Sequence, residues 1–180
     1  MKKVMRRFAL IVTLVTVFAS CSDDDSDPEV INEEETITTV RLSVTESGTT
    51  DTEVYTWTTD SQDDITLSAN TTYNFAIEFL DESDPSDVED ITEEVIDESD
   101  EHYVFYDNTV NELSFVAAAD DVVDADNISI NISTDWSTGD AATGILRAFL
   151  IHEPTTKTGD TRDDFGGETD IEVSFDVTVE

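Results

Sequence analysis

Hydrophobic and polar residues alternate along several segments of this 180-residue chain. The clearest segment is 71–83, TTYNFAIEFLDES, where Tyr73, Phe75, Ile77 and Phe79 alternate with polar or small residues. Successive side chains of a β-strand point to opposite faces, so this period of two predicts strands with one buried face. Antiparallel sheets covered on one side show such a pattern, and two of them pack face to face as a sandwich.

The same alternation recurs along the chain and predicts eight or nine strands. Short polar turns separate the segments, which favours an all-β fold: an antiparallel β-sandwich of immunoglobulin-like or Greek-key type. Segment 143–151, TGILRAFLI, is apolar on both faces except at Arg147, so we expect it in the centre of a sheet. The last strand should bury its odd-numbered residues from Ile171 to Val179. The predicted strands lie within 36–47, 53–59, 64–70, 71–83, 103–106, 112–119, 127–133, 143–151 and 170–180.

One acidic segment, 81–101, breaks the alternation, with 12 acidic residues among 21. Asp90 followed by Glu93 resembles a capping box, in which two side chains bond the first backbone N–H groups of a helix. We therefore predict one short helix near 91–98, and a loop is the alternative. The apolar residues at helical spacing in this segment are Val88, Ile91 and Val95.

The beginning of the chain has the composition of a signal peptide. A basic segment, MKKVMRR, precedes the 12-residue uncharged run FALIVTLVTVFA. A spanning helix needs about 20 apolar residues, whereas a signal-peptide core is shorter. FASC at 18–21 resembles a bacterial lipobox, whose cysteine is lipidated and becomes the new N-terminus. We expect a lipoprotein signal peptide over 1–20 and lipidation at Cys21; an uncleaved N-terminal anchor is the alternative.

An acidic segment follows the cysteine directly. Like charges repel and extend a chain, so 21–35 is expected to be a tether to a β-sandwich domain over 36–180. The four residues after Cys21 also resemble the surface-export signal of Bacteroidota lipoproteins. We therefore expect a lipid anchor in the outer membrane at the cell surface, with the periplasmic face as the alternative. The expected export residues are Ser22, Asp23, Asp24 and Asp25.

The chain is strongly acidic, with 8 basic and 44 acidic side chains and a formal net charge of −36. Nucleic-acid binding requires Lys and Arg to replace counterions, so this charge argues against a nucleic-acid partner. It also argues against adsorption to anionic lipid. It suits cation binding, or a solvated surface in an ion-rich medium that screens self-repulsion.

The two histidines are the main candidate metal ligands. His102 follows Glu101, and His152 precedes Glu153, each near the end of a predicted strand. Histidine with a carboxylate is a common ligand set for Zn or Cu. Fifty residues separate the histidines, so only the fold can bring the four side chains together. Ordinary surface histidines are the alternative interpretation.

Two acidic runs, 120–127 and 159–170, offer oxygen ligands for Ca. Calcium takes six to eight oxygens, but neither run follows the EF-hand order, and solvated turns are the alternative.

Gly166 and Gly167 indicate a turn that requires positive φ. Trp136 is interpreted as a packing residue, with stacking on a sugar as the other reading.

The sequence favours a protein that is not an enzyme. It has no G-x-S-x-G nucleophile elbow and no glycine-rich phosphate loop. Carboxylate pairs for glycoside hydrolysis carry no information among 44 acidic side chains.

Four segments, ITEEV, DEHYVFY, HEP and GGETDIEVSFDVTV, together resemble small acidic envelope lipoproteins of Bacteroidota, mainly flavobacteria. The resemblance covers most of 35–180. Members are often labelled type 1 periplasmic-binding-fold proteins, which implies an α/β fold of about twice this length, and the strand-rich pattern departs from that label. The resemblance implies an envelope lipoprotein that works beside a TonB-dependent outer-membrane receptor, and we carry over no sugar binding.

These observations predict a lipid-anchored accessory binding protein. It would capture a metal ion (Zn, Cu or Ca) or a small solute, or dock on an outer-membrane transport receptor. The alternative is a structural or adhesive surface protein whose acidic skin is adapted to salt. An enzyme acting on glycans ranks third.

Overall fold

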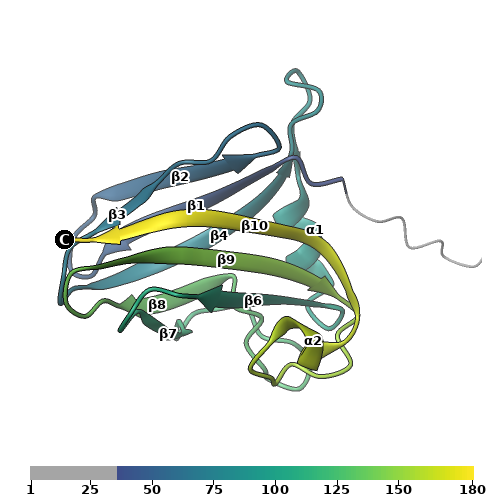
Figure 1. Ribbon diagram of the computed structural model, residues 1–180. Helices are drawn as coiled ribbons and strands as arrows, with labels where there is room; N and C mark the ends of the chain where they lie inside the picture. Colours follow the sequence, from purple (N-terminus) through teal and green to yellow (C-terminus); the bar gives the residue numbers. More distant parts are fainter. Residues whose placement is uncertain (1–35) are drawn as a thin grey trace, which may run out of the picture. The chain divides into compact units, whose positions relative to one another are not determined.

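The computed structural model describes residues 36–180, which form two β-sheets packed face to face (Figure 1). The expected signal peptide, Cys21 and the acidic tether through residue 35 lie outside the described residues. Within 36–180, neither helix is long and apolar enough to cross a membrane.

The larger sheet has six strands in the order β2–β1–β4–β8–β7, with β5 paired to one end of β4. The second sheet has the order β3–β10–β9–β6 and is antiparallel except for the β3–β10 pair. The larger sheet contains β1 (Thr39–Glu46), β2 (Thr52–Thr58), β4 (Thr72–Asp81), β5 (Glu89–Asp90), β7 (Ser114–Ala117) and β8 (Ser133–Ser137). The second contains β3 (Ile65–Leu67), β6 (His102–Asn108), β9 (Ala142–His152) and β10 (Glu168–Val179).

The predicted β-sandwich is confirmed, with ten strands in the described residues rather than eight or nine. The segment 143–151 lies in β9, between β10 and β6, as its two apolar faces predict. The prediction of a strand over 127–133 is wrong, since β8 begins only at Ser133, the last residue of that segment. Asn127 and Asn131 have positive φ there, which interrupts an extended chain. The Asp121 carboxylate accepts hydrogen bonds from two backbone N–H groups of this stretch.

Alternating residues of both sheets fill the space between them. The four apolar residues predicted to face inward from β4 are all buried. Trp136 on β8 is completely buried, and its ring stacks on Phe75 and Phe115 with centroid separations of 5.1 and 4.7 Å. Trp136 is therefore part of the core, which rules out the alternative of an exposed platform for a sugar.

The predicted short helix is α1 (Ile91–Asp97). Asp90 caps it, because its carboxylate accepts a hydrogen bond from a backbone N–H in the first turn. Ile91 and Val95 are buried, but Val88 is 49% exposed because it lies before the helix begins. The helix packs beside β4 at one end of the sandwich (Figure 1).

A second helix, α2 (Arg162–Phe165), is too short for sequence periodicity to reveal. Phe165 covers the outer face of the four-stranded sheet, where its ring lies 5.2 Å from Tyr103 and 4.8 Å from Phe105. This small aromatic cluster explains why β9 is apolar on both faces: one faces the main core and the other faces α2.

The chain leaves α2 through Gly166 and Gly167, whose φ values of 66° and 64° confirm the predicted turn. A Cβ atom on Gly167 would collide with the carbonyl oxygen of His152. Glycine therefore lets the start of β10 approach the end of β9 closely.

Candidate metal centre

Two histidines that are distant in sequence lie side by side at one end of the second sheet. His102 begins β6 and His152 ends β9, and the two residues are direct partners in the antiparallel pairing. Their rings stack nearly parallel, with 5.0 Å between centroids and 10° between planes. The register of two strands thus brings together the histidines that the sequence could only identify separately.

Glutamates flank this pair on both chain segments. The backbone N–H of Glu153 donates a hydrogen bond to the carbonyl of Glu101 at 2.7 Å, which ties the two segments together. One potential ligand atom from each of Glu101, His152 and Glu153 lies within 4.8 Å of the others. The four residues predicted as candidate ligands are therefore neighbours, and three of them bring possible ligand atoms close together.

The three ligand side chains differ in their access to solvent. The side chain of His152 is 12% exposed and that of Glu101 is 52% exposed, and Glu153 is an exposed residue. Glu153 also has a φ of 47°, which is uncommon outside glycine and turns the chain sharply after β9. A dissolved ion can thus reach the group from the surface while the imidazole remains held by the fold.

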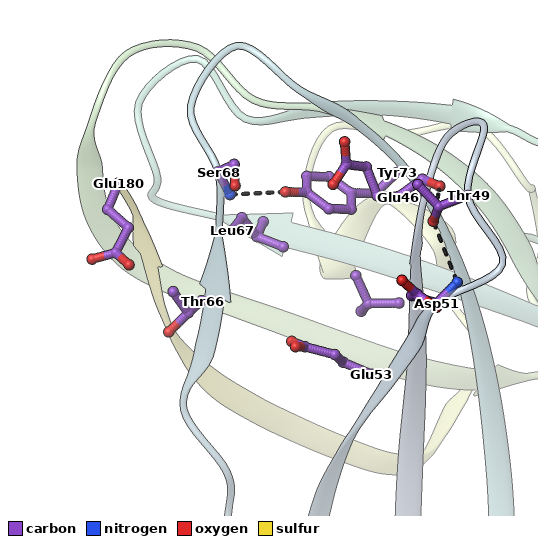
Figure 2. Close-up of a pocket in the computed structure, with 10 residues that line it drawn as sticks. Glu46, Thr49, Asp51, Glu53, Thr66, Leu67, Ser68, Tyr73 and Glu180 are labelled. Carbon is purple, nitrogen blue, oxygen red and sulfur yellow. Dashed lines mark hydrogen bonds between the residues drawn. The ribbon is translucent and has the colours of Figure 1, made fainter.

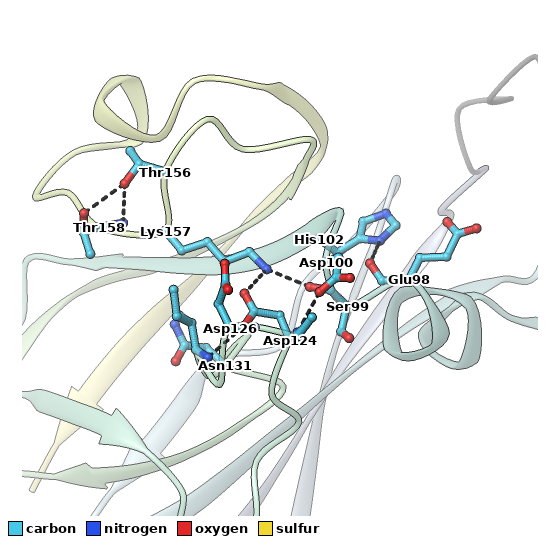
Figure 3. A network of polar contacts seen from close by, with 12 residues as sticks. Glu98, Ser99, Asp100, His102, Asp124, Asp126, Asn131, Thr156, Lys157 and Thr158 are labelled. Atoms are coloured by element: carbon cyan, nitrogen blue, oxygen red, sulfur yellow. Dashed lines mark hydrogen bonds and ion pairs between the residues drawn. The ribbon is translucent and has the colours of Figure 1, made fainter.

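His102 lies behind this group and is completely buried. Its Nδ1 is 3.2 Å from the carbonyl oxygen of Glu98, the residue that caps the end of α1. A carbonyl only accepts hydrogen bonds, so Nδ1 carries the proton and donates it to Glu98 (Figure 3). His102 therefore joins α1 to β6 and supports the inner face of the His152 ring.

Asp170, the last residue of the acidic run 159–170, completes the surroundings of His152, although the sequence suggested this run only as a source of calcium ligands. Its side chain is 3% exposed, and its Oδ1 lies 3.9 Å from His152 Nδ1. On the other side of the ring, Oε2 of Glu101 lies 3.9 Å from Nε2. The alternation of the last strand places Ile171 inward and therefore predicts that Asp170 points outward. In the structure its carboxylate instead lies buried beside His152.

A buried ion pair holds the neighbouring loops together (Figure 3). Lys157 Nζ lies 2.8 Å from Asp124 Oδ2 and 2.7 Å from the carbonyl oxygen of Ser99, and both charged side chains are only 7% exposed. The carboxylate of Asp100 also accepts the backbone N–H of Ala125 at 2.7 Å. These contacts connect the loop after Glu153 to the turn that precedes Glu101.

The charge of Asp124 is stabilised despite its burial. Burial by itself raises the pKa of this carboxyl, but hydrogen bonds from Lys157 and the backbone N–H of Ile128, and the positive charge of Lys157, outweigh it. The pKa of Asp124 is consequently below its ordinary value, and this carboxylate stays charged at neutral pH.

A cleft of about 340 Å³ lies near the opposite end of the sandwich, between the β1–β2 hairpin and β3 (Figure 2). Beside it, the Tyr55 hydroxyl donates a hydrogen bond to Glu53 at 2.6 Å, and Tyr73 accepts one from the backbone N–H of Ser68. Burial, followed by the Glu53 contact, raises the pKa of Tyr55 to about 12. The carboxylates around the cleft are those of Glu46, Asp51, Glu53 and Glu180.

The two runs predicted as possible calcium ligands use several of their acids to order their own loops. Asp124 accepts hydrogen bonds from the backbone N–H groups of Asp126 and Ile128, and Asp164 accepts them from those of Asp160 and Thr161. Neither run contributes to the metal-compatible group found within residues 36–180.

Comparison with protein-family models, curated proteins and solved structures found no match to this chain.

Proposed function

We propose that this chain is a lipid-anchored envelope protein that captures a divalent transition-metal ion through Glu101, His152 and Glu153. The observation that supports it is the convergence of one nitrogen and two oxygen ligands within 4.8 Å of one another. Imidazole combined with carboxylates suits Zn²⁺ or Cu²⁺, whereas Ca²⁺ takes six to eight oxygens. Three protein ligands leave a position for water or for the molecule that next receives the ion.

The charge of the whole chain supports capture of a cation. A formal net charge of −36 creates a negative potential that raises the local concentration of cations and their association rate. Because salt screens this potential, the charge assists encounter, while the three ligands supply selectivity.

The sequence also supports a location for this capture, at the outer membrane. The apolar leader, Cys21 and the acidic residues after it favour a lipid anchor in the outer membrane with the domain at the cell surface. The family resemblance favours a TonB-dependent receptor as the partner. In this role the protein holds the ion beside the receptor and catalyses no reaction.

A structural or adhesive surface protein with a salt-adapted skin is the second candidate. It is favoured by a groove of about 770 Å³ along α1 whose polar lining is entirely acidic. This role predicts that monovalent salt alone stabilises the fold, without a specific effect of Zn²⁺. The acidic residues of the groove are Asp87, Glu89, Asp90, Glu93, Glu94, Asp97 and Glu98.

The test is a titration of the purified protein with Zn²⁺, Cu²⁺ and Ca²⁺, followed by thermal unfolding and calorimetry. At a free Zn²⁺ concentration of about 100 times Kd, the metal should stabilise the fold by about 2.7 kcal/mol. The double variant Glu101→Gln/Glu153→Gln should lose this effect.

The matched control is Glu89→Gln/Glu93→Gln, which removes the same charge from two exposed residues outside the ligand group. It should retain Zn²⁺ binding. If neither Zn²⁺ nor Cu²⁺ at millimolar concentration raises the Tm of the unmodified protein, or if both double variants lose the effect equally, the proposed site is wrong.

A further inference from the structure

Strand β10 contains one extra residue beside the metal centre. Thr169 pairs with Ile151 and Ile171 pairs with Leu150, although these two partners are adjacent in β9. Asp170 is therefore the inserted residue of a β-bulge. A bulge redirects side chains locally, and this one turns a carboxylate that the alternation assigns to the outer face toward the interior.

The redirected carboxylate lies against the His152 ring. Asp170 Oδ1 lies 3.9 Å from Nδ1, while Glu101 Oε2 lies 3.9 Å from Nε2, so the two nitrogens face different carboxylates. The Asp170 side chain is 3% exposed and that of Glu101 is 52% exposed. A buried carboxylate is costly unless it interacts with a polar or charged group, which makes this placement informative.

We propose that Asp170 is the positioning residue of the metal site and that it selects which nitrogen of His152 binds the ion. From the interior it keeps the proton on Nδ1, so the lone pair of Nε2 faces the ion between Glu101 and Glu153. Metal-binding histidines commonly direct their second nitrogen to a carboxylate in this way. This inference rests on the proposed function and names the residue that tunes its site.

The same arrangement determines how the ring is held. The present 3.9 Å separation is longer than a hydrogen bond, so we expect Asp170 and His152 to approach to about 2.8 Å when an ion binds. His102, locked to Glu98 and stacked on the ring, limits tilting during that approach. The imidazole then favours Zn²⁺ or Cu²⁺ over the oxygen-seeking ions Ca²⁺ and Mg²⁺.

The test compares Zn²⁺ affinity in the unmodified protein, Asp170→Asn and Asp176→Asn, using a competing chelator of known affinity. Asp170→Asn keeps the side-chain volume and should weaken Zn²⁺ binding about 10- to 100-fold. Its metal-free Tm should not fall, because the change also removes a buried charge. Asp176→Asn is the control, since Asp176 is an exposed residue of the same strand. This variant should bind Zn²⁺ with the affinity of the unmodified protein.

A second measurement reads the tautomer of His152 directly. In the metal-free protein, two-bond ¹H–¹⁵N spectra of the neutral imidazole should show the proton on Nδ1. The Nε2-protonated form in the unmodified protein would overturn the inference even if Asp170→Asn fails to fold. Equal Zn²⁺ affinity of Asp170→Asn and the unmodified protein would overturn the role of Asp170 but leave the proposed function standing. Absence of Zn²⁺ binding by the unmodified protein would overturn both.

Discussion

Lys157→Met is expected to lower the free energy of unfolding by about 3 kcal/mol. Removing one partner of a buried ion pair typically costs about 3–5 kcal/mol, because the other charge remains buried without compensation. Here Asp124 retains backbone hydrogen bonds from Asp126 and Ile128 at 2.9 and 2.8 Å, which places the cost at the lower end. The carbonyl of Ser99 also loses the ammonium that lies 2.7 Å away.

The assay is urea unfolding of the unmodified protein, Lys157→Met, Asp124→Asn and the double variant. The double-mutant cycle separates the pairwise interaction from the cost of each substitution. Arg147→Met is the matched control, because Arg147 pairs with Asp107 at 3.0 Å on the surface, with side-chain exposures of 33% and 47%. An exposed pair of this kind contributes about 0–1 kcal/mol.

The expected ranking is therefore a large loss for Lys157→Met and a small one for Arg147→Met. Because the buried pair is poorly screened, the loss from Lys157→Met should persist at high salt. Equal losses for the two variants, or a coupling energy near zero between Lys157 and Asp124, would refute the conclusion that this pair holds the loops around the candidate metal centre.

Three further changes test other parts of the fold. Gly167→Ala should cost at least about 1–2 kcal/mol, because φ is 64° and the new Cβ meets the His152 carbonyl; an unchanged urea midpoint would contradict this. The phenol of Tyr55 has a folded pKa of about 12 against an ordinary value of 10.0, so the unfolded chain ionises first and stability should fall as pH rises between these values. Tyr55→Phe should make that decline shallower, and an equally steep decline would exclude Tyr55 as a cause. Asp90→Ala removes the N-cap of α1 and should cost about 1 kcal/mol in urea unfolding, whereas no loss would show that the cap is dispensable.

The sequence was sufficient to predict the fold class because its dominant signal is local. Alternation along β1, β4 and β10 determines which side chains are buried, and the inward rows expected from it form the core. The capped α1 was also predictable, since Asp90 and the buried Ile91 and Val95 lie within a single short segment. These features depend on neighbours a few residues apart.

Other parts of the fold depend on long-range contacts that leave no periodic trace. The segment 127–133 has the composition of a strand, yet hydrogen bonds to Asp121 and two asparagines with positive φ make it a loop. The parallel pairing of β3 with β10 joins the third strand to the last, which alternation cannot predict. Composition alone cannot anticipate such tertiary constraints.

The candidate metal centre likewise contains residues that the sequence could identify and one whose place it could not predict. Its histidines and glutamates were identifiable from residue type, and the register of β6 with β9 brings them together. Asp170 belongs to the acidic run 159–170, but its place beside His152 was not identifiable, because one inserted residue in β10 reverses the direction that alternation assigns to it. A bulge changes the pairing by a single residue and is therefore invisible in a period-two pattern.

The most direct test of metal capture is anomalous diffraction from crystals of the protein loaded with one equivalent of Zn²⁺. We predict a peak about 2.0–2.2 Å from His152 Nε2 and from carboxylate oxygens of Glu101 and Glu153. A peak bound to His152 Nδ1, a peak elsewhere on the acidic surface, or no peak at full loading would contradict the proposed site.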